Sequence, residues 1–170
     1  MKANRESRAL AAIVLAAGLS SRMKENKLLL HWKNSTVIGW VVSQLVKAEM
    51  RRIFVVTGRD ANVVESLTSF PGVKHIYNKL YADGEMLHSL QAGLKMLPGE
   101  VDGALVVLGD QPQIEIEIIQ LVARAFEDNP NCKLILPSFQ NRRGHPWIVA
   151  RELWDEIISM ELPDNLRTFL

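Results

Sequence analysis

The sequence predicts an α/β fold: a single-domain, Rossmann-like three-layer sandwich with a mostly parallel sheet. Stretches with strand character alternate with stretches of helical periodicity, which is typical of a parallel sheet covered by helices on both faces. The stretch at 104–108 is fully apolar and bounded by glycines, as expected of a buried strand. With 170 residues, of which 48% are hydrophobic and 23% charged, the chain can form one globular domain with a sizeable core.

The expected strands are short apolar runs, often rich in β-branched residues. They lie at 11–15, 53–57, 73–77, 104–108, 133–136 and 146–150. The expected helices carry apolar residues at helical spacing, and Asp60 is a candidate cap for the second of them. The helices are expected at 36–50, 60–69, 86–97, 116–127 and 152–160.

The loop after the first strand has the layout of an anion-binding turn. The apolar segment 11–17 ends in Gly18, and a short polar loop with Arg22 and Lys27 follows. A glycine allows a tight turn, and free backbone N–H groups together with two cations suit a phosphate. The spacing alone leaves two interpretations open: a phosphate-binding turn, or a strand followed by a solvated basic loop.

Two common nucleotide motifs do not fit this loop. A P-loop has a second glycine five residues after the first, then Lys and Ser or Thr, whereas Met23, Lys24 and Glu25 stand at these positions. A dinucleotide fingerprint would have glycines where Ser20 and Met23 stand. The loop therefore belongs to neither the P-loop nor the dinucleotide-binding class.

Ligands of parallel sheets bind at the carboxyl ends of the strands. The loop after the first strand and the turn at Gly109 and Asp110 both lie at such ends. We therefore expect Gly18, Arg22, Lys27 and Asp110 around one crevice.

Four segments occur in a characteristic order over most of the chain. They are L-A-A-G-L-S-S-R-M-K-E-N-K at 15–27, M-L-H-S-L-Q-A-G at 86–93, L-G-D-Q-P at 108–112 and R-R-G-H-P at 142–146. Together they resemble nucleotidyltransferases of the molybdenum cofactor cytidylyltransferase type, which are related to the molybdopterin guanylyltransferases and, more distantly, to the methylerythritol cytidylyltransferases. The resemblance implies a nucleotide-diphospho-sugar transferase-like fold.

The implied reaction transfers an NMP, CMP from CTP, to a phosphorylated acceptor of the molybdopterin or molybdenum cofactor type. Pyrophosphate is released and Mg²⁺ is the implied cofactor. The resemblance gives catalytic roles to Arg22 on the triphosphate, Lys27 near the α-phosphate and Asp110 as the metal ligand. The implied nucleotide-binding residues are Leu15, Ala16, Ala17, Gly18, Ser20, Ser21, Arg22, Lys27, Ser89 and Gly109, and the implied acceptor-binding residues are Arg143, Gly144 and His145.

Each of these segments also has a plainer interpretation. Lys27 could be a solvated surface cation, Asp110 could cap a helix beginning near Ile114, and Ser89 could cap a helix N-terminus. The segment 142–146 could be a basic turn that enters an edge strand at its proline.

The same motifs are compatible with two alternative functions. One is a nucleotidyltransferase specific for GTP, a sugar phosphate or methylerythritol phosphate. Ala16-Ala17-Gly18, in place of Ala-Gly-Gly, favours the cytidylyl over the guanylyl pattern. The other is a non-catalytic nucleotide- or pterin-binding protein that partners a molybdoenzyme or its maturation factor.

Composition narrows the partners and the location. The net charge of +1 gives no electrostatic case for nucleic acid or membrane binding, and the single Cys132 excludes an internal disulfide. The single cysteine fits a reducing cytoplasm, and no apolar run approaches the roughly 20 residues that span a bilayer, so we expect a cytoplasmic protein. We also expect residues 1–170 to form one nucleotidyltransferase domain that lacks the C-terminal strand and second metal carboxylate common in the family.

Overall fold

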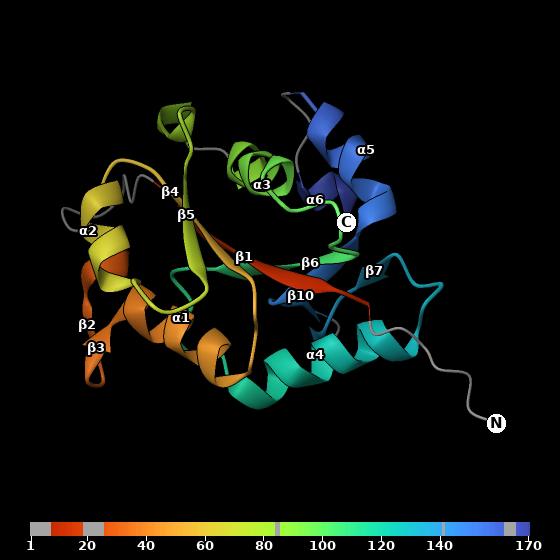
Figure 1. The fold of residues 1–170 in the computed structure, drawn as a ribbon, viewed down its shortest axis with the longest axis horizontal. Helices are drawn as coiled ribbons and strands as arrows, with labels where there is room; N and C mark the ends of the chain where they lie inside the picture. The colour runs from red at the N-terminus through yellow and green to blue at the C-terminus, as the bar shows by residue number, and fades with distance from the viewer. Residues whose placement is uncertain (1–7, 19–25, 84–85, 141, 162–165) are drawn as a thin grey trace.

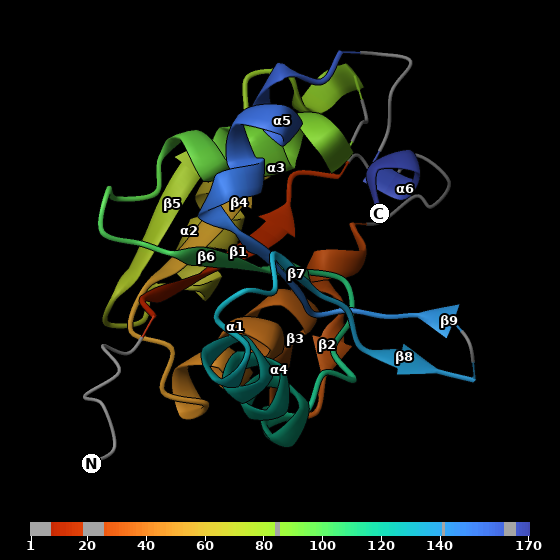
Figure 2. The ribbon, with the colours of Figure 1, turned by 90° about the vertical axis from the view of Figure 1, so that its right-hand side faces the viewer.

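A computed structural model describes residues 8–18, 26–83, 86–140, 142–161 and 166–170. Its centre is a six-stranded sheet with the strand order β5-β4-β1-β6-β10-β7 (Figures 1 and 2). The strands are β1 (Leu10–Ala16), β4 (Ile53–Thr57), β5 (Val73–Tyr77), β6 (Gly103–Leu108), β7 (Leu134–Ile135) and β10 (Trp147–Ala150). The first four are parallel to one another, whereas β10 runs antiparallel to both β6 and β7.

Helices cover both faces of the sheet, which confirms the predicted three-layer α/β class (Figure 1). One face is covered by α1 (Val37–Lys47), α2 (Ala61–Leu67) and α4 (Ile116–Asp128), and the other by α3 (Met86–Lys95), α5 (Trp154–Ser159) and α6 (Leu166–Phe169). A hydrophobic core lies on each face of the sheet, and successive residues of β1 point to these two cores alternately. Ala12 and Val14 pack on the α1 side, and Ala11 and Ile13 pack on the α3 side. Because both sides of β1 are buried, its sequence is a continuous apolar run.

The ends of two predicted helices shift for local reasons. Helix α1 begins after Thr36, whose Oγ1 accepts a hydrogen bond from the Gly39 N–H, and it ends early because Glu49 has a left-handed φ of 63°. Helix α2 follows Asp60, but the Asp60 carboxylate makes no capping hydrogen bond. The carboxylate instead accepts a hydrogen bond from Asn26, 2.6 Å away.

Several short elements do not follow from the sequence pattern, because two or three residues carry no periodicity. They are the hairpins β2 (His31–Trp32) with β3 (Ser35–Thr36) and β8 (Ser138–Phe139) with β9 (Arg142–Arg143), and the 3₁₀ helices η1 (Lys27–Leu29), η2 (Tyr81–Asp83) and η3 (Arg151–Leu153). Figure 2 shows the β8–β9 hairpin projecting from the sheet beside β7 and β10. Within the described residues, no helix has the length and apolar character needed to cross a membrane.

Candidate active site

The first and third motifs of the sequence meet at the carboxyl ends of β1 and β6. These strands are parallel neighbours, with Leu15 paired to Leu108. Just beyond them, the Gly109 N–H donates a hydrogen bond to the Leu15 carbonyl oxygen over 3.0 Å. The glycine turn after β1 and the Gly-Asp turn after β6 are thereby joined.

A pocket of about 260 Å³ opens at this edge of the sheet. Its lining combines apolar residues, several of them at strand ends, with one cation, one carboxylate and the hydroxyl groups of a serine and a tyrosine. The lining residues are Leu15, Ala16, Ala17, Gly18, Lys27, Leu28, Tyr81, Met86, Ser89, Leu108 and Asp110. The structure thus brings together every predicted nucleotide-binding residue that it describes except Gly109, which lies between two lining residues. The predicted Ser20, Ser21 and Arg22 lie outside the described residues.

Lys27 reaches the pocket from η1, whose start is held at two points. The Asn26 side chain accepts a hydrogen bond from the Leu28 N–H at 3.0 Å and donates one to Asp60 at 2.6 Å. Leu28 is buried beneath the turn. The exposed Lys27 therefore projects from an anchored turn.

Asp110 is exposed at the pocket and does not cap the following helix. Helix α4 starts at Ile116 with Glu115 in the N-cap position, so the capping interpretation of Asp110 is wrong. In the described part of the chain, no group of three or more His, Cys, Asp or Glu residues could hold a metal ion. A Mg²⁺ ion that also binds substrate phosphates needs only one or two protein carboxylates, so Asp110 fits that kind of site.

Ser89 is the fourth residue of α3 and therefore not its N-cap, so the capping interpretation is wrong here too. It is buried, and its Oγ accepts a hydrogen bond from the Asn78 side-chain amide at 3.2 Å. Asn78, which directly follows β5, is only 3% exposed. Sequence reasoning missed Asn78; its place directly after a parallel strand is the signal that could have found it.

Tyr81 and Met86 also line the pocket without having been predicted. Tyr81 lies against Gly58, where an added Cβ would come within 2.8 Å of both the Tyr81 Cβ and the Ala17 carbonyl oxygen. Gly58 follows β4 directly, so a glycine at a strand end again marks the pocket edge. Only a residue without a side chain lets Tyr81 approach this closely.

The predicted acceptor-binding residues are not among the lining residues of the pocket, although His145 lies within electrostatic reach of Asp110. Gly144 is held by a hydrogen bond from its N–H to the Pro137 carbonyl oxygen at 2.9 Å, and Arg143 is exposed. Burial lowers the pKa of His145 below its ordinary value, against an opposing effect of the Asp110 carboxylate. The segment leads into β10, which lies between β6 and β7, so the edge-strand interpretation is wrong.

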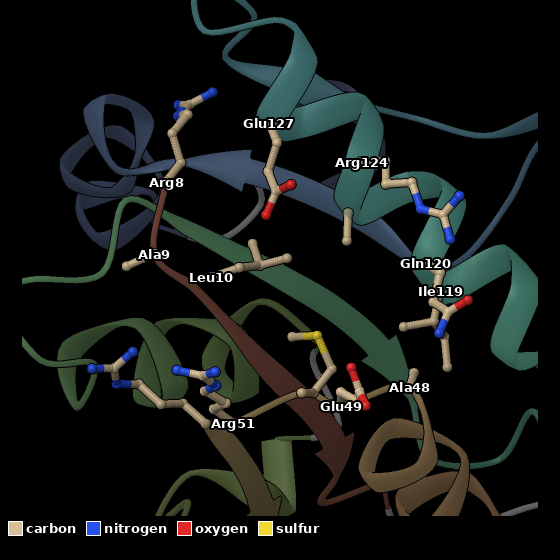
Figure 3. Close-up of a pocket in the computed structure, with 13 residues that line it drawn as sticks. Arg8, Ala9, Leu10, Ala48, Glu49, Arg51, Ile119, Gln120, Arg124 and Glu127 are labelled. Atoms are coloured by element: carbon tan, nitrogen blue, oxygen red, sulfur yellow. The ribbon is translucent and has the colours of Figure 1, made fainter. Parts of the chain in front are cut away.

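A second, open cavity of about 1030 Å³ lies at the opposite end of β1 (Figure 3). Arg8, Glu49, Arg51, Arg124 and Glu127 are among its lining residues, so charges of both signs face it. They come from the segment before β1, the α1–β4 connection and α4 (Figure 3). Ligands of parallel sheets bind at the carboxyl ends of the strands, so the smaller pocket is the candidate active site.

The fold and the comparisons with known proteins define the chain as a nucleotidyltransferase. The model of the MobA-like NTP transferase domain matches residues 12–170. The chain belongs to this family, which confirms the resemblance found in its motifs.

Two of the similar proteins are named as enzymes of the molybdenum cofactor. A molybdenum cofactor cytidylyltransferase from Escherichia coli K12 is 28% identical over 163 residues, which cover 95% of this chain and 81% of the relative. A probable molybdenum cofactor guanylyltransferase from Bacillus mycoides KBAB4 is 29% identical over 141 residues, covering 82% of this chain and 66% of the relative. The bifunctional protein GlmU from Cyanothece sp. PCC 7425 is 30% identical over 132 residues, but the chain spans only 28% of its length.

Solved structures share the fold. The crystal structure of Rv0371c from Mycobacterium tuberculosis H37Rv has a TM-score of 0.81 at 21% identity, covering 96% of this chain and 82% of that chain. A structure of the same protein in complex with manganese has a TM-score of 0.75 at 20% identity and covers the same shares of the two chains. A nucleotidyl transferase from Methanothermobacter has a TM-score of 0.75 at 24% identity, covering 90% of this chain and 76% of that chain.

Proposed function

We propose that the protein transfers CMP from CTP to the phosphate group of a molybdopterin-type acceptor and releases pyrophosphate. The observation that carries the proposal is the shared pocket: Gly18, Lys27, Ser89 and Asp110, from four separate segments, line it together. The pocket combines a turn that suits phosphate, a cation, a hydroxyl and a carboxylate. These are the groups that a bound nucleoside triphosphate and its metal ion require.

In the proposed reaction, a phosphate oxygen of the acceptor attacks the α-phosphorus of the triphosphate. The new P–O bond forms as the bond to the bridging α–β oxygen breaks, and its electron pair leaves with pyrophosphate. Lys27 stabilises the charge on the phosphate oxygens as it shifts, and Arg22 is proposed to hold the triphosphate. Positioning and electrostatics dominate this kind of transfer, and the nucleophile is already ionised, so no general base is required.

Asp110 is proposed to hold a divalent metal ion together with the phosphate oxygens. When bound, Mg²⁺ would neutralise part of the triphosphate charge. The proposal is supported by the exposed carboxylate at the pocket and by a manganese complex of the structurally similar Rv0371c.

The acceptor is proposed to lie on the side of Arg143, Gly144 and His145. Arg143 supplies a positive charge suited to a phosphate, and the lowered pKa of His145 keeps its ring neutral near pH 7. A neutral ring can donate one hydrogen bond and accept another, which suits a polar pterin. Support for molybdopterin comes from the cytidylyltransferase and guanylyltransferase relatives.

The test is pyrophosphate release measured with each of the four nucleoside triphosphates in the presence of molybdopterin and magnesium. We expect CTP to give the fastest release. Faster release with GTP would move the assignment to a guanylyltransferase. If a folded preparation binds nucleotide without releasing pyrophosphate from any triphosphate, the protein is a binding partner and the catalytic proposal is wrong.

A further inference from the structure

Asn78, which is buried, connects three segments around the pocket through its backbone and its side chain. Its backbone N–H donates to the Thr57 carbonyl oxygen at 2.9 Å, and its backbone carbonyl accepts from the Tyr81 N–H at 3.2 Å. Its side-chain Oδ1 accepts from the Leu80 N–H at 3.0 Å, and its Nδ2 donates to Ser89 Oγ at 3.2 Å. One residue thus joins the end of β4, the turn that carries Tyr81, and helix α3.

The Leu80 contact determines which way the carboxamide faces. A backbone N–H can only donate, so it selects the oxygen end of the Asn78 side chain. The nitrogen end then faces Ser89, and an amide nitrogen can only donate. Ser89 Oγ must therefore accept this hydrogen bond, and its own hydrogen is left to point elsewhere.

The hydrogen of the Ser89 hydroxyl has no protein acceptor among the described residues. Ser89 is 6% exposed and lines the pocket. The Asn78 amide occupies one acceptor position of the hydroxyl and leaves its hydrogen to be donated. Because Ser89 lines the pocket, an acceptor atom of a ligand bound there can receive that hydrogen.

We propose that Asn78 is a positioning residue that makes Ser89 a hydrogen-bond donor to an acceptor atom of the bound nucleotide. The inference rests on the proposed function, because it requires a nucleotide in the pocket. Asn78 itself does not line the pocket, so it acts through Ser89.

The substitution Asn78→Asp tests the direction of this hydrogen bond with almost no change of shape. Its carboxylate still accepts from the Leu80 N–H but has no N–H for Ser89. The Ser89 hydroxyl then donates to the carboxylate and is turned away from the nucleotide. We expect the dissociation constant for CTP, measured by calorimetry with magnesium, to rise about tenfold.

The new carboxylate could also repel the triphosphate directly, and a double-mutant cycle separates the two causes. Ser89→Ala removes the donor and should weaken binding about tenfold as well. If Asn78 acts through Ser89, the double variant binds no more weakly than Ser89→Ala alone. Ser89→Thr keeps the hydroxyl and should restore most of the affinity. Asn129→Asp, at the exposed end of α4, is the matched control and should bind as the wild type does.

Thermal unfolding of each variant checks that the fold is kept. If Asn78→Asp does not fold, Asn78→Ser replaces it, because a serine oxygen can still accept from the N–H two residues on while donating no amide hydrogen. The inference is overturned if CTP binding is unchanged in the Asn78 variant, or if the losses of the two single variants multiply in the double variant. Wild-type protein that binds no triphosphate would overturn the proposed function, and this inference with it.

Discussion

The Gly109 N–H donates a hydrogen bond to the carbonyl oxygen of Leu15 over 3.0 Å, joining the turns that follow two neighbouring strands. A Cβ added at Gly109 would lie 3.0 Å from that same oxygen and 2.9 Å from the Ile38 side chain. The close approach of the two turns, whose residues Gly18 and Asp110 line one pocket, therefore depends on a residue without a side chain.

Gly109→Ala is accordingly expected to destabilise the protein by about 1–3 kcal/mol, because backbone and core must shift to make room. Gly99→Ala is the matched control, since an added Cβ there meets no atom within 4 Å. Its expected effect is within about 0.5 kcal/mol or slightly stabilising. Urea unfolding of both variants measures the difference, and equal stabilities would show that the turn tolerates a side chain.

Lys27→Ala tests the cation at the pocket. Loss of one preorganised charge on the phosphates is expected to lower kcat/KM for nucleotidyl transfer about 100-fold, with little change in folding stability. Lys95→Ala, an exposed lysine at the end of α3, should leave the rate unchanged. If the Lys27 variant is as active as the Lys95 variant, Lys27 is a solvated surface cation with no role in the transfer.

Substitution of Gln91, on α3, tests how much its hydrogen bonds to the end of α5 stabilise the fold. Its buried Nε2 lies 2.9 Å from the carbonyl oxygens of Ile157 and Met160, at the end of α5. Gln91→Met keeps the length of the side chain but removes its N–H donor from both carbonyls, and the Ile157 carbonyl then keeps only the Met160 N–H. The lost hydrogen bonds are expected to cost about 1–3 kcal/mol of unfolding free energy. Gln113→Met, at an exposed loop position, is the control. If both variants unfold at the same denaturant concentration, the Gln91 contacts contribute nothing to stability.

His145 is expected to make stability depend on pH. In the unfolded chain, His145 takes up a proton near its ordinary pKa of 6.5. In the folded protein, burial lowers the pKa of His145, so the ring is protonated only at lower pH. The unfolded state therefore binds more protons below about pH 6.5, and the unfolding free energy falls as the pH falls towards the lowered pKa.

His145→Gln should remove this contribution, so that its stability falls less steeply below about pH 6.5 than that of the wild type. Gln113→Asn, at an exposed turn position, is the control and should keep the wild-type slope. Urea unfolding without metal or nucleotide, repeated at several pH values, measures these slopes. Identical slopes for wild type and the His145 variant would contradict the assigned direction of the pKa shift.

The fold and much of the pocket lining could be predicted because they depend on local patterns. Buried strands are continuous apolar runs, and the positions of Gly18 and Asp110 after parallel strands place them at one edge of the sheet. The roles of Asn78 and Tyr81 could not be predicted. They depend on which atoms of β4, the β5–α3 connection and α3 meet in space, and no periodicity encodes those contacts.

Binding of CTP in the presence of magnesium, measured by calorimetry for the wild type and for Asp110→Asn, tests most directly whether the pocket is a metal-dependent triphosphate site. Asp128→Asn, at the exposed end of α4, serves as the control. We predict that the wild type and the control bind CTP alike, that omitting magnesium weakens binding, and that Asp110→Asn binds at least tenfold more weakly. Equal binding by Asp110→Asn and the wild type, or no binding of any triphosphate by folded wild-type protein, would contradict the proposal that the pocket is a metal-dependent triphosphate site.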